Sequence, residues 1–298
     1  MLYLAATLTS NFLLYMNTNQ DIKNQQESTW NKFSSGWKKW DNQNNTFTGI
    51  ISKTLVNAVP FKSTDHVLDI ASGTGEPGIS IAANKVPQGR VELTDISQAM
   101  LDVAGTFAAD RNVTNIGMHR CSVDELPFAN DTFDAVTCRF GFMFFPDIAA
   151  AIQELKRVMK PGAMLSTAVW STPAKNIFAS LPNSIINRNV EMPAPQPGSP
   201  GMFRCAAPGY LTGLFEEQGF TDVTEQEVLF SMNTDSIDTY WKFTTELAAP
   251  VVAAMAKADE ATKAKIKEEV FAACEQYMQD GKFSIPAAAL VITARKSH

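Results

Sequence analysis

The chain has 298 residues, of which 45% are hydrophobic, and its formal net charge is −6. This length can bury a large core in one large domain or two modest ones, and we predict a single domain over residues 27–298. The lysines and arginines are scattered along the sequence, so it does not indicate the basic surface that binding to nucleic acid requires.

The four cysteines and three histidines argue against a disulfide framework and a protein-bound metal. The cysteines lie far apart and form no C-x-x-C pair, and no two histidines are spaced four residues apart on a plausible helix. We therefore predict a protein of the reducing cytoplasm, with no metal and with a monomeric or homodimeric state.

The N-terminal segment is predicted to be a poorly ordered tail over residues 1–26, with Met1 or Met16 as the true start. Residues 1–16 are mildly apolar, but they lack the basic start of an export signal and are too short and too polar to span a bilayer. The next residues, 17–28, are mostly Asn, Gln, Asp and Lys, a composition that cannot bury enough surface to order itself.

Two helices are predicted over residues 27–58, as a lid. Trp30, Phe33, Trp37 and Trp40 recur at intervals of three, four and three residues, which places them on one stripe of a helix. Ser28 or Thr29 is the expected cap of this helix, and the second helix is expected at 46–58.

Strands then alternate with helices over residues 59–172. Apolar strand-like runs are found at 66–71, 90–96, 116–121, 133–140 and 163–170, and helical patterns separate them at 76–86, 97–110 and 147–160. Strands that alternate with helices pair in parallel through crossovers, so this segment predicts a doubly wound α/β sheet that binds a cofactor.

The regular alternation of strands and helices ends after Trp170. Residues 173–207 are predicted to be a lid loop, because the stretch at 189–203 is rich in proline and glycine. Residues 208–298 are expected to form C-terminal strands and helices, with a helix at 208–218, strands at 222–231 and 287–295, and long helices between the two strands.

The sequence VLDIASGTGEPG at residues 67–78 places Gly73, Gly75 and Gly78 in the register G-x-G-x-x-G after a strand. Such a turn directs backbone N–H groups at a ligand across the strand ends. A P-loop is excluded, because no Lys-Ser or Lys-Thr follows the glycines. Asp95 lies 22 residues after Gly73, a spacing that suits the ribose of a nicotinamide dinucleotide and of other nucleosides.

Asp69 favours a ligand without phosphate. It lies four residues before Gly73, where its carboxylate would repel a pyrophosphate and attract a cation. S-adenosylmethionine carries a sulfonium and an ammonium group, offers ribose hydroxyls to Asp95, and has no phosphate. The residues therefore favour S-adenosylmethionine over a dinucleotide.

Four segments together carry a family resemblance. They are VLDIASGTGEPG (67–78), VELTDISQAML (91–101), DELPFANDTFDAVTCRFGF (124–142) and ELKRVMKPGAMLSTAVW (154–170). With these motifs the chain resembles class I S-adenosylmethionine-dependent methyltransferases, and most closely the group that includes the ubiquinone and menaquinone C-methyltransferases. The resemblance implies a Rossmann-like, seven-stranded, mostly parallel sheet whose last strand is antiparallel, and methyl transfer to a small molecule.

The resemblance also implies roles for residues at the strand ends. Asp69 would lie near the methionyl ammonium, partly through water, and Asp95 would bind both ribose hydroxyls. The backbone carbonyls of Cys138 and Arg139 would face the ammonium. The remaining cofactor positions are Ala71, which replaces the first family glycine, Gly73, Thr74 and Gly75 beneath the ligand, and Ile96 and Met100 against adenine.

The adenine amino group is the position where the chain departs from the family. There an acidic residue shortly before Leu126-Pro127-Phe128 usually accepts its hydrogen bond, and here Ser122 aligns with that acid, followed by Val123 and then Asp124. A hydroxyl accepts a hydrogen bond less strongly than a carboxylate does.

The acceptor side is predicted from aromatic residues, and no catalytic base is identified. An apolar or aromatic acceptor, methylated at carbon, oxygen or nitrogen, would suit a pocket lined by such side chains. The candidate acceptor residues are Trp37, Trp40, Phe140, Phe142 and Tyr210.

Two alternatives remain open. One is a nicotinamide-dependent oxidoreductase, although no tyrosine is followed four residues later by the lysine that a short-chain reductase needs. The other is a catalytically idle module that keeps the cofactor pocket as a sensor or scaffold.

Overall fold

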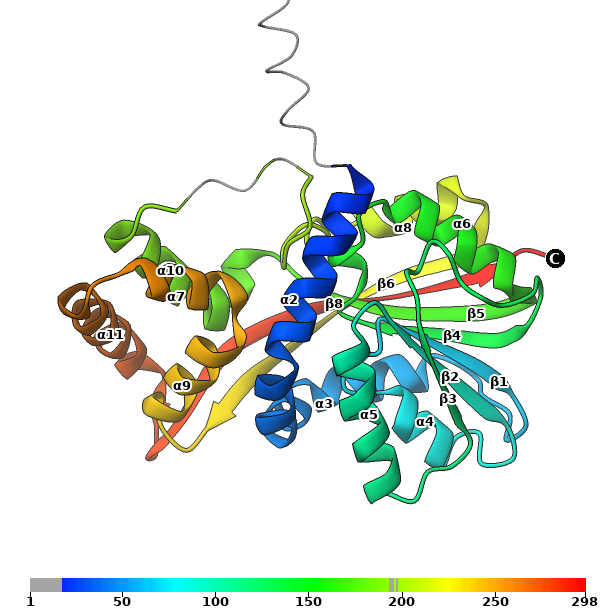
Figure 1. Ribbon diagram of the computed structural model, residues 1–298, viewed down its shortest axis with the longest axis horizontal. Coiled ribbons are helices and arrows are strands. Elements are labelled where there is room, and N and C mark those ends of the chain that lie inside the picture. Colours follow the sequence, from blue (N-terminus) through cyan, green and yellow to red (C-terminus); the bar gives the residue numbers. More distant parts are fainter. Residues whose placement is uncertain (1–17, 193–195, 197) are drawn as a thin grey trace, which may run out of the picture.

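A central sheet with helices on both faces forms the body of the chain in the computed structural model, which describes residues 18–192, 196 and 198–298 (Figure 1). The strands run in the order β3-β2-β1-β4-β5-β8-β6, and β7 pairs with β8. Their bounds are β1 (His66–Ile70), β2 (Arg90–Asp95), β3 (Ile116–Arg120), β4 (Phe133–Arg139), β5 (Met159–Trp170), β6 (Phe220–Thr234), β7 (Met278–Gln279) and β8 (Lys282–Lys296).

The first five strands of the sheet are parallel. β1 pairs with β2 and β4, β2 with β3, and β4 with β5, whereas β8 runs antiparallel to both β5 and β6. These pairings confirm the predicted doubly wound sheet with an antiparallel last strand. Because the chain moves outward in opposite directions from β1 and β4, the carboxyl ends of these two strands form the crevice where such sheets bind ligands.

Helices cover both faces of the parallel strands. α3 (Asp41–Asn57), α4 (Gly78–Asn84) and α5 (Gln98–Asp110) lie on one face, and α6 (Ile148–Val158) and α8 (Tyr210–Glu217) lie on the other (Figure 1). Successive strand residues point to opposite faces. In β1, accordingly, Val67 belongs to the same buried cluster as Leu101 of α5, and Leu68 belongs to the same buried cluster as Leu155 of α6.

A second group of helices surrounds the far ends of β6 and β8. It consists of α7 (Ile177–Asn189), α9 (Ile237–Leu247), α10 (Ala249–Lys257) and α11 (Glu260–Cys274) (Figure 1). Elsewhere in the chain, short 3₁₀ turns occur at Phe142–Phe144 (η1), Pro173–Lys175 (η2) and Glu275–Tyr277 (η3). Tyr240, Ile266 and Phe283 belong to a core that these helices share with the strand ends. We call this group the helical cap.

The helix α2 (Asn19–Lys39) crosses the molecule between the sheet and the helical cap (Figure 1). The prediction of a disordered tail to residue 26, and of a cap at Ser28 or Thr29, is wrong for residues 19–26. Thr18 caps the helix by accepting a hydrogen bond from the Asp21 backbone N–H at 3.2 Å, while the Asp21 carboxylate accepts one from the Thr18 N–H. Residues 1–17 of the predicted tail, with both candidate start methionines, lie outside the described residues.

The predicted lid loop at 173–207 is also wrong in part, because α7 occupies its first half. The polar and proline-containing sequence of this helix hides its periodicity, yet Ile185 and Ile186 are buried in the helical cap.

No helix in the described ranges combines the length and the apolar character that crossing a bilayer would require.

Candidate active site

The turn after β1 has an unusual backbone. Ala71, Gly73 and Gly75 have φ values of 49°, 52° and 105°, in the left-handed region that favours glycine. A Cβ at Gly75 would lie 2.4 Å from the Ile79 side chain, so the turn also lacks room for a side chain there. The Gly75 N–H donates to the Ser72 carbonyl at 2.8 Å. The turn therefore holds its backbone close to the ends of β1 and β2.

Asp69 is fully buried beneath this turn. Its carboxylate accepts hydrogen bonds from the Gly78 N–H at 3.0 Å and from the Thr137 hydroxyl at 2.6 Å. Burial raises the pKa of Asp69 to about 7, although both hydrogen bonds act in the opposite direction. A carboxylate has about four acceptor positions, so Asp69 keeps capacity for a further donor.

Asp95 joins the glycine turn to the start of α5. Its carboxylate accepts from the Gly73 N–H at 2.9 Å and from the Ser97 N–H at 2.8 Å, and burial raises its pKa to about 6. Ser97 caps α5, because its hydroxyl accepts a hydrogen bond from the Met100 N–H at 3.1 Å. Met100 is buried and Ile96 is half-buried at this helix start.

The loop after β3 contains the three residues at the predicted adenine position. The Ser122 hydroxyl donates to Asp124, and Lys23 of α2 pairs with the same carboxylate at 2.7 Å. Burial would raise the pKa of Asp124, but the contacts with Lys23 and Ser122 outweigh it and lower that pKa. Val123 is buried in the core on the α6 face. Sequence reasoning missed Lys23, which lies in the segment whose composition resembles a tail.

The end of β4 places Cys138 and Arg139 in different surroundings. The Cys138 carbonyl accepts a hydrogen bond from the Thr167 hydroxyl at 2.9 Å. The Arg139 side chain extends to α3, where its Nη1 donates to the Thr48 hydroxyl at 3.1 Å and to the Ser52 hydroxyl at 2.9 Å. The prediction concerned only the backbone of Arg139 and missed this side chain, whose partners lie about ninety residues earlier in the chain.

Helix α2 and the start of α3 lie over these groups. The Asn31 side-chain oxygen accepts from the Ser97 hydroxyl at 2.7 Å and from the Ala99 N–H at 3.3 Å, at the start of α5. Thr74 of the glycine turn donates from its hydroxyl to Asp41 at 3.3 Å. The sequence did carry a signal for the length of α2, because Thr18 and Asp21 have the spacing of a capping box.

Phe140 directly follows Arg139 and belongs to an aromatic cluster. Its ring stacks on Trp170 with a centroid separation of 4.2 Å and an interplanar angle of 9°. Trp170 is the hub of the cluster, which consists of Phe47, Phe140, Trp170, Phe178 and Phe230 and joins the sheet to the helical cap. The prediction missed Trp170, because its position at the end of a strand pattern does not reveal which rings surround it.

The other candidate acceptor residues lie elsewhere. Phe142 is fully buried in the core, with its ring 5.5 Å from Phe215. Trp40 donates from Nε1 to Glu246 at 2.8 Å and so joins α2 to α9, and Tyr210 is 40% exposed at the start of α8. The structure thus gives Phe142 and Trp40 packing roles and Tyr210 a surface position, whereas Trp37 lies against Trp30 on α2 at 6.2 Å.

Comparison with known proteins decides the family. Residues 21–186, more than half of the chain, match the profile of the ubiE/COQ5 methyltransferase family. The chain belongs to the ubiE/COQ5 methyltransferase family. This membership confirms the predicted class I methyltransferase resemblance and S-adenosylmethionine as the cofactor.

Individual relatives give the same family and fold. The chain is 32% identical over 152 residues to the ubiquinone/menaquinone biosynthesis C-methyltransferase UbiE of Cellvibrio japonicus, across 49% of this chain and 61% of that protein. It is 30% identical over 165 residues to the demethylmenaquinone methyltransferase of Staphylococcus aureus, across 54% of this chain and 68% of that protein. The match thus covers less than two thirds of the Cellvibrio relative.

The fold is shared with phosphoethanolamine N-methyltransferase 2 of Haemonchus contortus, whose structure contains S-adenosylhomocysteine. The TM-score is 0.55 at 15% identity, and the alignment covers 95% of this chain and 61% of that one. At this identity the likeness shows the architecture alone.

The residues of this ubiE/COQ5 family member fit the cofactor at the strand ends. The Ser72 hydroxyl in the turn and the Trp37 Nε1 on α2 are buried without a hydrogen-bond partner among the described residues. Burial also leaves Asp69 and Asp95 with raised pKa values, which a cationic ligand with hydroxyl donors would lower. The turn therefore offers one hydroxyl that is unpaired within the described residues, that of Ser72, and the two carboxylates keep further acceptor capacity for the ammonium and hydroxyl groups of the cofactor.

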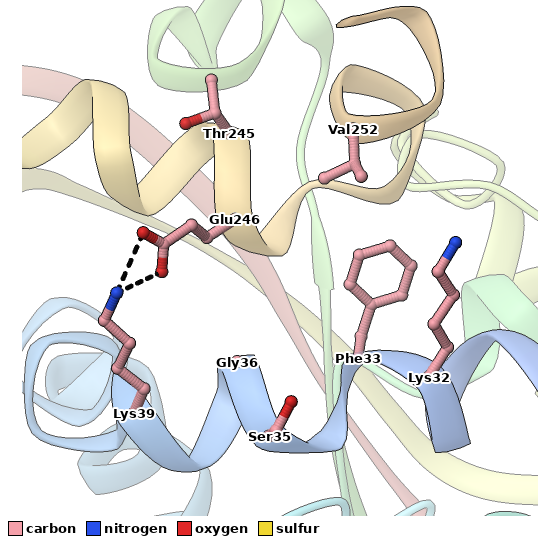
Figure 2. A pocket seen from close by; sticks show the side chains of 8 residues that line it. All are labelled: Lys32, Phe33, Ser35, Gly36, Lys39, Thr245, Glu246 and Val252. Atoms are coloured by element: carbon pink, nitrogen blue, oxygen red, sulfur yellow. Dashed lines mark hydrogen bonds and ion pairs between the residues drawn. The ribbon is translucent and has the colours of Figure 1, made fainter. Parts of the chain in front are cut away.

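A hollow on another side of α2 is separate from these groups. It lies between α2 and the helices α9 and α10, where Phe33 faces Val252 and Lys39 pairs with Glu246 at 2.6 Å (Figure 2). The lysines that line it are largely exposed, and its lining contains none of the predicted cofactor residues. The hollow therefore does not contribute to the candidate active site.

Proposed function

We propose that the chain transfers the methyl group of S-adenosylmethionine to an aromatic acceptor of quinol type. The observation that carries this proposal is the stack of Phe140 on Trp170 directly beside the glycine turn. A Cβ on Gly141, the next residue, would lie 2.8 Å from the Ala71 Cβ, so the backbone after Phe140 abuts the turn. The names of the two bacterial relatives support an acceptor of the quinone type.

We assign the cofactor contacts to residues at the ends of β1, β2 and β4. Asp95 accepts the ribose hydroxyls, and Asp69 stabilises the ammonium group. The turn from Ala71 to Gly75 passes beneath the nucleoside, and Ile96 and Met100 pack against the adenine ring. When bound, the cofactor supplies an electrophilic methyl group on a sulfonium.

The chain's own contribution to the reaction is position and the exclusion of water. Methyl transfer from a sulfonium is an in-line displacement, so most of the acceleration comes from alignment of the acceptor with the methyl group. The aromatic cluster aligns a flat ring by stacking. Helix α2, held over the strand ends by Asn31 and Lys23, keeps water from the site.

The test is the release of S-adenosylhomocysteine by purified protein over a panel of quinols, phenols and amines. We expect release with quinols or phenols that carry an open ring position, and identification of the product gives the methylated atom. Binding of the cofactor without release for any acceptor would instead indicate the idle module. Saturation by a nicotinamide dinucleotide would indicate the oxidoreductase.

We infer further that the protein works in the cytoplasm on a small-molecule acceptor, as a monomer or homodimer. All four cysteines are free thiols in the structure, and three of them are buried. Light scattering coupled to size exclusion measures the oligomeric state directly, and a tetramer or larger assembly would contradict this inference.

A further inference from the structure

Arg139 differs from the other arginines of the chain in its partners. Six of the eight arginines pair with a carboxylate in the structure. Arg204 instead donates to the backbone carbonyls of Phe145 and Pro146. Arg139 donates only to neutral side-chain oxygens of α3, which belong to Asn45, Thr48 and Ser52 at 2.9–3.4 Å from its Nη1. Within the described ranges, therefore, it is a cation held in place without an anion.

The three carboxylates that act on Arg139 electrostatically make their direct contacts with other groups. Asp69 accepts from Thr137 and Gly78, Asp41 accepts from Thr74, and Glu76 pairs with Arg111. These three carboxylates favour the charged form of Arg139 at a distance, yet burial dominates and lowers the pKa of its guanidinium. A desolvated guanidinium is stabilised most by direct, bidentate hydrogen bonding to an anionic group.

The position of Arg139 points to the methionyl end of the cofactor. It is the last residue of β4, two residues after Thr137, which holds Asp69, and one before Phe140 of the aromatic cluster. The residue is nevertheless only half-buried, so part of it remains accessible. The methionyl group carries an ammonium and a carboxylate on one carbon atom, so a site for the ammonium at Asp69 needs an anion site close by.

We propose that the Arg139 guanidinium binds the carboxylate of the methionyl group, while Asp69 serves the ammonium. This proposal rests on the proposed function, since it assigns a subsite of the same cofactor. Asn45, Thr48 and Ser52 hold the guanidinium in orientation without neutralising it. The site is thereby specific for the zwitterion, and a nucleoside without the carboxylate binds more weakly.

The test compares three nucleosides by calorimetry: S-adenosylhomocysteine, its decarboxylated analogue, and 5′-methylthioadenosine, which lacks both charged groups. We expect the wild-type protein to prefer S-adenosylhomocysteine over the decarboxylated analogue by about 10- to 100-fold, as for a hydrogen bond between charged groups. Arg139→Gln should abolish this preference and leave the affinity for 5′-methylthioadenosine unchanged, which also reports that the variant is folded. Arg139→Lys should retain part of the preference.

Arg204→Gln is the matched control, because it removes a second arginine without a carboxylate partner and should leave the preference intact. The proposal is overturned if Arg139→Gln discriminates between the first two nucleosides as the wild type does. The same holds if only the KM for the acceptor rises, which would assign Arg139 to an anionic oxygen of the acceptor. If the wild type binds none of the three nucleosides, it is the proposed function that fails.

Discussion

At the scale of single residues, the candidate site contains two carboxylates whose hydrogen-bond partners in the structure are neutral groups. Asp69 and Asp95 are both buried, and their partners are backbone N–H groups and hydroxyls. Their pKa values of about 7 and about 6 show that burial outweighs these bonds. Burial thus disfavours the charged form of both carboxyls in the free protein, and a cationic nucleoside would favour that form.

Replacement of Asp95 by asparagine should weaken binding of S-adenosylhomocysteine by about 10- to 100-fold, because a neutral amide is a weaker acceptor than a carboxylate for the ribose hydroxyls. Isothermal calorimetry measures this change. Asp102→Asn, on the exposed face of α5, is the control and should bind normally. Equal affinity of Asp95→Asn and the wild type would remove Asp95 from the ribose site.

The pH dependence of binding has a definite sign. Below about pH 6 the free protein protonates Asp95 and Asp69, whose folded pKa values are raised, so a positively charged ligand meets neutral acids. Affinity for S-adenosylmethionine should therefore rise between pH 5.5 and 8, with protons released on binding near pH 6.5. Calorimetry in two buffers of different ionisation enthalpy measures that release, and proton uptake would contradict the assignment.

The same raised pKa values reduce the stability of the free protein as pH rises. A folded carboxyl with a raised pKa contributes stability below its unfolded pKa of 3.8 and loses it as pH rises through about 6 or 7. The increase in melting temperature on binding S-adenosylmethionine should thus be larger at pH 8 than at pH 5.5. Differential scanning fluorimetry at the two pH values is the measurement, and an equal increase at both would count against linkage to these carboxyls.

The sequence predicted the residues of the glycine turn and both aspartates, because motif spacing fixes positions at strand ends. It did not predict the side-chain partners of Arg139 or the hub position of Trp170. Those depend on α3 and the helical cap, which pack against the strands from distant parts of the chain. Local patterns predict which residues reach the crevice, and tertiary packing decides what each one contacts there.

At the scale of elements, we propose that α2 closes the site, where polar contacts hold it in addition to the packing of Trp30 and Trp40. Asn31 holds the start of α5, Lys23 pairs with Asp124, and Arg120 pairs with Glu27 at 2.7 Å. The Lys23–Asp124 pair is largely buried, with side chains 11% and 21% exposed, whereas the Arg120–Glu27 pair is more exposed and contributes little to stability. These contacts hold the helix against the body of the protein. This also explains why composition predicted a tail over residues 19–26, because that part of the helix is stabilised by contacts with the body and not by an apolar face.

Asn31→Ala should loosen this closure. We expect the dissociation rate of S-adenosylhomocysteine to increase by about 3- to 10-fold, the equivalent of one hydrogen-bonding side chain, with little change in melting temperature. Stopped-flow displacement measures the rate. Gln20→Ala, at the exposed start of the same helix, should leave the rate unchanged. A rate for Asn31→Ala equal to that of the wild type would show that α2 does not control release.

At the scale of the whole molecule, two hydrophobic cores meet at the aromatic cluster. One core lies between the sheet and its helices, and the other lies within the helical cap, around the ends of β6 and β8. Trp170, at the end of β5, contacts Phe178 of α7 and Phe47 of α3. The acceptor site that we propose lies at the junction of these two cores, beside the proposed cofactor site.

If the proposal is right, Phe140 serves acceptor binding and Phe142 serves packing, and two matched substitutions test this. Phe140→Leu keeps apolar volume but removes the ring that stacks on Trp170. We expect the KM for an aromatic acceptor to rise several-fold, in line with about 0.5–1.5 kcal/mol for an aromatic pair, while affinity for S-adenosylhomocysteine stays the same.

Phe142→Leu makes the same chemical change two residues later, at a fully buried position in the core. It should lower the melting temperature through a loss of about 1 kcal/mol, typical of hydrophobic exchanges in a core, without a change in KM. Steady-state kinetics and thermal unfolding of both variants give the comparison. If Phe140→Leu affects only stability, or Phe142→Leu raises the KM, the acceptor lies elsewhere than beside the aromatic cluster.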